Sequence, residues 1–142
     1  MVGPARRFKT ADVAQQLVGG FLLAGPFVVT EEVWVLAESM STLQGLLTTA
    51  IVFGIGYGAL YKADTRDPDR EVDVAGIPAR FLSLMAVSFG SVIVLALAFD
   101  APSTFLSGLD VERGRWLAVT AKAVSVGSVF SVVGAATADS VF

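Results

Sequence analysis

The sequence predicts an all-α polytopic membrane protein in which four transmembrane helices form a bundle. Hydrophobic residues make up 54% of the 142 residues, and the mean hydropathy is +0.71. A soluble domain is only about 45–50% apolar. Four apolar stretches also reach the roughly 20 residues that one helix needs to cross a bilayer. These stretches use up most of the chain, so we expect a single transmembrane domain over residues 1–142.

The expected spans cover residues 13–38, 42–61, 80–99 and 116–138. The first contains Pro26, which removes a backbone hydrogen bond, so we expect this helix to bend between Leu22 and Gly25. A connection of only three residues, Ser39 to Ser41, predicts a tight helical hairpin between the first two spans. Charged loops follow at residues 62–79 and 100–115, and the second is expected to include a short surface helix near Phe105.

Basic residues beside the spans predict the orientation of the chain in a cell membrane. Two of them, Arg113 and Arg115, lie on one side of the membrane. The other side includes the N-terminal arm and the loop before the third span. The basic residues of that other side are Arg6, Arg7, Lys9, Lys62, Arg66, Arg70 and Arg80. We therefore expect both termini in the cytoplasm. Trp34 and Trp116 would then lie near the outer interface, where amphipathic aromatic rings are enriched.

The composition excludes several kinds of chemistry. The chain contains no Cys and no His, which removes disulfides, thiolate nucleophiles and the commonest general base. We therefore expect no enzyme activity, no cofactor and no transition-metal site. An ion site would be built from oxygen ligands, which suit protons, alkali cations, Mg²⁺ or Ca²⁺. No basic stripe with interleaved aromatic residues supports nucleic-acid binding.

The charge balance is acidic, with a net charge of −3 and a pI of about 4.8. Aspartate-rich loops with few lysines are typical of proteins from a halophilic organism. An acidic loop in an ordinary organism is the alternative interpretation.

Two adjacent glutamates, Glu31 and Glu32, are the first candidates for a functional site. Carboxylates in or at the edge of hydrocarbon are costly and often functional. In a continuous first helix they would lie in its outer third. Lys122 is six residues into the last span, about 9 Å from its outer end, and thus at a matching depth. One interpretation pairs Glu32 with Lys122 inside the bundle. In the other, the glutamates reach the headgroups and Lys122 snorkels.

Polar side chains at the same level are expected to line an outward-facing cavity. They are Thr30, Gln44 and Thr48. The alternative is that such hydroxyls bond to carbonyl groups of their own helices. Asp139, at the inner end of the last span, is expected to be solvated.

Small residues predict close packing between helices. Gly54 and Gly58 form one small-xxx-small pair, and Gly127 and Ser131 form another in the last span. The segment from Gly54 to Gly58 superficially echoes a potassium filter, but it lies inside a continuous span rather than in a re-entrant loop. Small faces on two of the four spans favour tight packing and a homo-oligomer, either a dimer or a larger assembly.

The segment from Pro26 to Trp34 resembles the first-helix signature of a family of integral membrane proteins called domain of unknown function 2391. In that family, a Gly- and Leu-rich run leads to a Pro, then a Thr, then Glu-x-Trp. Here Pro26, Thr30, Glu32 and Trp34 match, whereas Glu31 stands where an apolar residue is common. The resemblance covers the first span only. It implies a small helical membrane protein without an established activity, and it directs attention to Glu32.

Small multidrug exporters also have four short helices and a glutamate in the first. This chain lacks the motif that surrounds their glutamate, and its charge bias disfavours insertion in both orientations.

The sequence therefore predicts an oligomeric channel or transporter for protons or a small cation. Glu32 would be its titratable site, modulated by Glu31 and Lys122. The alternative is a non-transporting accessory or structural protein that binds a membrane partner through its small-residue faces. The hydration of the glutamates distinguishes these two functions. A transporter needs its glutamates in a hydrated cavity, whereas a structural protein would bury them in ion pairs away from water.

Overall fold

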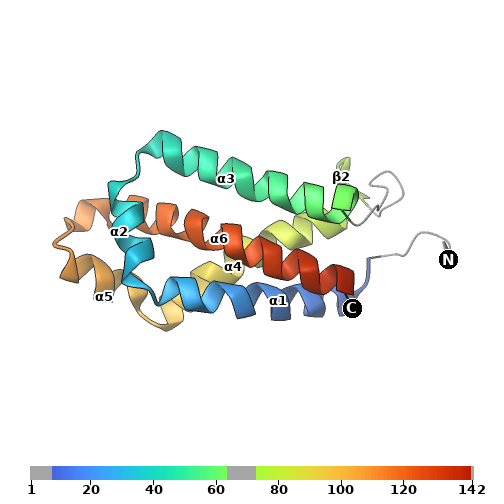
Figure 1. Cartoon of the computed structure of the whole chain (residues 1–142), viewed down its shortest axis with the longest axis horizontal. Coiled ribbons are helices and arrows are strands. Elements are labelled where there is room, and N and C mark those ends of the chain that lie inside the picture. The colour runs from blue at the N-terminus through green and yellow to red at the C-terminus, as the bar shows by residue number, and fades with distance from the viewer. Residues whose placement is uncertain (1–7, 64–72, 142) are drawn as a thin grey trace.

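The computed structural model describes residues 8–63 and 73–141, which form a bundle of long helices (Figure 1). Four helical segments are long and apolar enough to cross a membrane. They are built on α1 (Thr10–Val28), α3 (Thr42–Tyr57), α4 (Ala79–Ala98) and α6 (Trp116–Val141). A π-helix, η1 (Gly58–Ala63), continues α3. The predicted all-α bundle is confirmed.

α6 is the central helix, because it packs against α1, α3 and α4. Its closest neighbour is α1, which crosses it at Gly19 and Gly134. A Cβ on either glycine would collide with the carbonyl oxygen of the other. Only glycine therefore allows the two backbones to approach this closely, as expected where small residues drive helix packing in membranes.

The smaller elements lie at the two ends of the bundle. At one end are α2 (Glu31–Ser39), α5 (Ala101–Gly108) and the 3₁₀-helix η3 (Arg113–Arg115), and we call this the α2 end (Figure 1). At the opposite end α1 begins and α6 terminates, and we call this the terminal end. There the short antiparallel strands β1 (Asp73–Val74) and β2 (Ile77–Pro78) precede α4. The short helix predicted near Phe105 is confirmed as α5.

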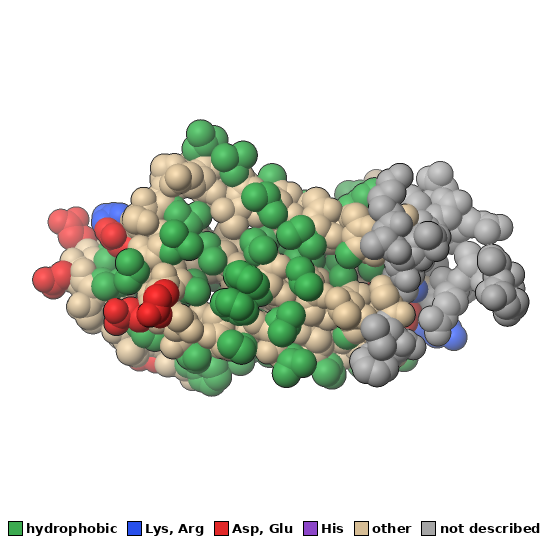
Figure 2. Space-filling view, viewed as in Figure 1, with side chains coloured by type: hydrophobic (Ala, Val, Ile, Leu, Met, Phe, Trp, Pro, Cys, Tyr) green, Lys and Arg blue, Asp and Glu red, His purple; other side chains and the backbone are tan. Residues whose placement is uncertain are grey.

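Two clusters of buried apolar side chains form the core. The cluster toward the α2 end surrounds Trp34 and Leu106. The cluster toward the terminal end surrounds Leu60 and Leu84. Trp34, in the first of these clusters, is only 1% exposed. The middle of the bundle also presents apolar side chains outward, and Figure 2 shows them over its visible face.

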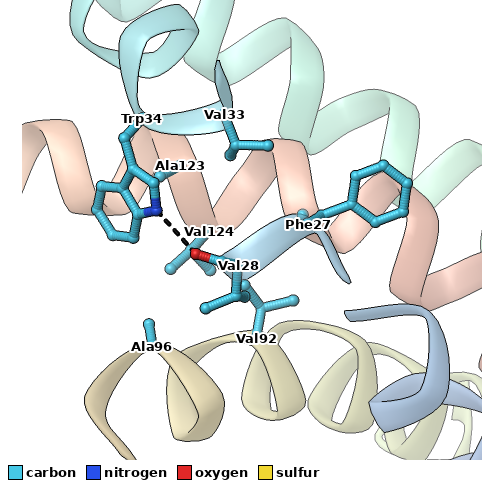
Figure 3. A pocket seen from close by; sticks show the side chains of 9 residues that line it. Phe27, Val28, Val33, Trp34, Val92, Ala96, Ala123 and Val124 are labelled. Carbon is cyan, nitrogen blue, oxygen red and sulfur yellow. Dashed lines mark hydrogen bonds between the residues drawn. The ribbon is translucent and has the colours of Figure 1, made fainter. Parts of the chain in front are cut away.

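The expectation of one bent helix from residue 13 to residue 38 is wrong. α1 ends at Val28, α2 begins at Glu31, and Thr30 between them has an extended backbone. Pro26 and the β-branched residues that follow it weaken the helix at this point. The break is also stabilised, because the Trp34 indole N–H donates a 3.0 Å hydrogen bond to the Val28 carbonyl (Figure 3). That bond gives one of the freed carbonyls of the α1 end a partner.

The break between α1 and α2 changes the depth in the membrane that the sequence suggests for α2. α1 has 19 residues, and at about 1.5 Å per residue it is roughly 28 Å long, close to the 30 Å thickness of a bilayer core. α1 is therefore long enough to span the hydrocarbon without the help of α2. With α1 as the span, α2 would lie at the boundary of the hydrocarbon rather than within its outer third.

Candidate functional site

Glu31 and Glu32 occupy the first turn of α2, and both are exposed. The N-terminus of a helix favours negative charge, so their position has a local electrostatic reason. They belong to a group of acidic side chains at the α2 end, which Figure 2 shows in red beside the apolar middle of the bundle. Within the described part of the chain, no ion pair or hydrogen bond involves either carboxylate.

Lys122 does not meet Glu32. Its half-buried side chain runs toward the α2 end, where the ammonium group donates a 2.7 Å hydrogen bond to the Met40 carbonyl. Met40 is the residue that caps the C-terminus of α2. The geometry is therefore that of a snorkelling lysine that reaches the negative end of a helix dipole.

The three residues expected to line a cavity are held by local hydrogen bonds. The Thr30 hydroxyl donates to the Pro26 carbonyl at 2.6 Å, and the Thr48 hydroxyl donates to the Gln44 carbonyl at 2.8 Å. The Gln44 side chain accepts a 2.8 Å bond from the Ser41 backbone and completes a capping box at the start of α3. Gln44 and Thr48 also line a groove of about 490 Å³, whose other residues are apolar.

The two small-residue pairs have different surroundings. A Cβ on Gly127 would come within 2.9 Å of Val92 on α4. The Ser131 hydroxyl lies 2.8 Å from the Ser91 hydroxyl and donates to the Gly20 carbonyl at 3.1 Å. This pair thus lies between helices of one chain. For Gly54 and Gly58, nothing in the described part of the chain lies within 4 Å of an added Cβ.

A cluster of buried charges, which the sequence did not predict as a site, lies at the terminal end. It consists of Asp12 on α1, Arg80 on α4 and Asp139 on α6, and we call it the charge cluster. The Arg80 guanidinium lies 2.7 Å from Asp139 and 3.4 Å from Asp12. Arg80 is 1% exposed and Asp139 is 0% exposed. The expectation that Asp139 is solvated is wrong, because α6 is central and its last turns are covered by α1 and α4.

Two neutral side chains extend the charge cluster into the bundle. The Gln16 side-chain amide donates a 3.1 Å hydrogen bond from Nε2 to Asp139, and its Oε1 accepts a 2.7 Å bond from the Ser83 hydroxyl. Gln16 lies one helical turn beyond Asp12 on α1. That spacing puts both side chains on one helix face, and it was the signal in the sequence that this face of α1 is polar where it meets its neighbours.

Hydroxyl groups also lie between the helices farther along. The Ser128 hydroxyl donates to the Val124 carbonyl of its own helix at 2.7 Å and lies 3.4 Å from the Ser88 carbonyl on α4. The Thr49 and Ser125 hydroxyls lie 3.0 Å apart. Nowhere in residues 8–63 and 73–141 do three or more acidic residues converge in a geometry that could hold a metal ion. The polar groups between these helices are thus ionisable side chains at the terminal end and hydroxyl groups farther along.

Comparison with known proteins identifies the family. The model of a family described as "Putative integral membrane protein (DUF2391)" matches residues 5–139, nearly the whole chain. No curated protein and no solved structure matches the chain.

Proposed function

The chain belongs to this family of integral membrane proteins, and we propose that it moves protons or a small cation across the bilayer. The charge cluster would be its titratable site. The observation that carries this proposal is the complete burial of Arg80 and Asp139 within helices of membrane-spanning length. Ionisable groups inside membrane bundles are costly and usually mark ion pathways or proton relays.

The charge cluster suits this role better than Glu32 does. Asp139 accepts bonds from both Arg80 and Gln16, so a change in its protonation would alter contacts among three spans. Glu32 is exposed at the α2 end and changes no such contact. We assign Glu31 and Glu32 to the surface, where acidic groups raise the local concentration of cations.

Hydroxyl groups that follow one another from the charge cluster toward the α2 end support a proton pathway. Along α4, Ser83 and Ser88 are five residues apart, about 7.5 Å of helix rise. Ser88 is followed by the pair of Ser91 and Ser131, and Thr49 and Ser125 lie nearer the α2 end. With both termini in the cytoplasm, the charge cluster would face the cytoplasmic side of the membrane. A second copy against the outward Gly54 and Gly58 would give a homo-oligomer.

The second candidate is a non-transporting accessory or structural protein. The close approach of α1 and α6 at Gly19 and Gly134 favours it, because such tight packing opposes the helix movements that a transporter needs. In that case the charge cluster would act only as a clamp between α1, α4 and α6.

Flux measurements test the proposal. Purified protein would be reconstituted at high salt in liposomes that contain a pH-sensitive dye, then challenged with H⁺, Na⁺, K⁺ and Ca²⁺ gradients. Asp139→Asn should abolish flux, whereas the matched surface variant Asp110→Asn should leave it unchanged. Elution of each variant at the wild-type volume on size exclusion would show that the assembly is intact.

Three other results would contradict the assignment of the charge cluster as the titratable site of a transporter. Loss of flux in Glu32→Gln together with normal flux in Asp139→Asn would place the titratable site on α2. Flux that is unchanged in both variants would remove both carboxylates from the mechanism. Absence of flux for every ion in the wild type would favour the accessory protein.

A further inference from the structure

We propose that an anionic phospholipid binds in the groove between α3 and α6, with its phosphate at Lys122. This groove has a volume of about 230 Å³ and lies at the α2 end. We call it the Lys122 groove. Its lining includes Leu46, Thr49, Ala118, Ala121, Lys122 and Ser125.

The position of the ammonium group gives the first argument. Lys122 lies six residues into α6, but its side chain extends back to the Met40 carbonyl at the link between α2 and α3. With α1 as the span, this link would be at the level of the headgroups. A lipid phosphate lies at the same level.

The unused capacity of Lys122 gives the second argument. An ammonium group has three donors, and the hydrogen bond to Met40 uses one of them. Across the described ranges, no carboxylate lies within ion-pair distance of this ammonium group. By contrast, Arg115 at the same end is paired with Glu38 at 3.1 Å. Lys122 thus has no carboxylate partner in the described part of the chain, and two of its three donors remain for a phosphate.

The walls of the Lys122 groove give the third argument. Leu46, Ala118 and Ala121 are exposed, so the groove opens sideways to whatever surrounds the bundle. In a membrane span that surrounding is lipid. The Thr49 and Ser125 hydroxyls at the deep end bond to each other at 3.0 Å, which leaves an apolar surface suited to an acyl chain. A cationic mouth above an apolar groove is complementary to an anionic phospholipid.

Native mass spectrometry of the whole protein in detergent tests this assignment. Phosphatidylglycerol and phosphatidylcholine of identical chains would be titrated, and retained lipid would be counted. One basic group near the membrane surface favours an anionic lipid by about fivefold. We expect the wild type to show such a preference and Lys122→Gln to lose it. The matched control is Arg113→Gln, which removes the same charge at the same end and should keep the preference.

A second variant keeps the test decisive if Lys122→Gln fails to fold. Ala121→Leu retains the lysine but fills the groove, so it should lower phosphatidylglycerol retention toward the level of phosphatidylcholine. Equal retention of the two lipids by the wild type would overturn the proposal. So would a preference that survives in both variants, or full displacement of the lipid by glycerol phosphate, which has no acyl chains.

Discussion

Breaking the charge cluster should destabilise the protein far more than breaking a surface ion pair. Removal of one partner from a buried pair costs about 3–5 kcal/mol, because it leaves an uncompensated charge in a low-dielectric interior. Arg80→Gln takes the cation from two carboxylates, Asp12 and Asp139. Asp139→Asn takes one carboxylate from a cation that also contacts Asp12. We therefore expect the greater loss for Arg80→Gln.

A double-mutant cycle measures the coupling between Arg80 and Asp139. The double variant should recover part of the loss, since residues in one buried network couple by about 0.5–3 kcal/mol. The free energy of unfolding would be measured in mild detergent by titration with SDS. The control is Glu38→Gln, which breaks the exposed pair with Arg115 and should cost only about 0–1 kcal/mol. Single effects that add within about 0.3 kcal/mol would refute the buried pairing of Arg80 with Asp139.

The remaining predictions concern the helix crossing, the helix break and the orientation of the chain. Gly134→Val should lower the free energy of unfolding by at least about 1–3 kcal/mol in the same assay, because the added side chain overpacks the crossing of α1 and α6. The control is Gly54→Val, whose Cβ meets nothing within 4 Å in the described part of the chain, and its effect should be smaller. Trp34→Phe should cost about 1–3 kcal/mol, because the carbonyl at the end of α1 loses its indole donor; an unchanged free energy of unfolding would show that this bond is not needed at the break. For orientation, an impermeant thiol reagent outside the cell should label a Cys at Ser107 and not one at Thr65, which lies outside the described residues, and labelling of Thr65 alone would reverse the topology.

Local sequence patterns were sufficient to predict three of the long helices. Runs of apolar residues and their lengths indicate α3, α4 and α6 because these helices are uninterrupted. The break after Val28 was harder to predict, because Pro26 is compatible both with a bent helix and with a helix that ends. The donor that stabilises the break, Trp34, lies six residues beyond the carbonyl that it binds. Such a bond is visible only once the direction of α2 is known.

The charge cluster could not be predicted from local patterns, because its members are far apart in the chain. Arg80 and Asp139 are separated by 59 positions, and Gln16 and Asp139 by 123. In the sequence, each is a polar residue near the end of an apolar run, which is also where solvated residues occur. Only the central position of α6 brings Asp139 between α1 and α4.

Arg80 illustrates how one residue can satisfy two independent requirements. Its positive charge contributes to the basic bias that predicts orientation, and that argument needs only proximity to the membrane. In the structure the same charge is 1% exposed and bridges Asp12 and Asp139. A solvated arginine at this position would serve the orientation equally well. The burial therefore needs a separate reason, and the ion pairs of Arg80 with Asp12 on α1 and Asp139 on α6 supply it, because they join α4 to both neighbouring spans.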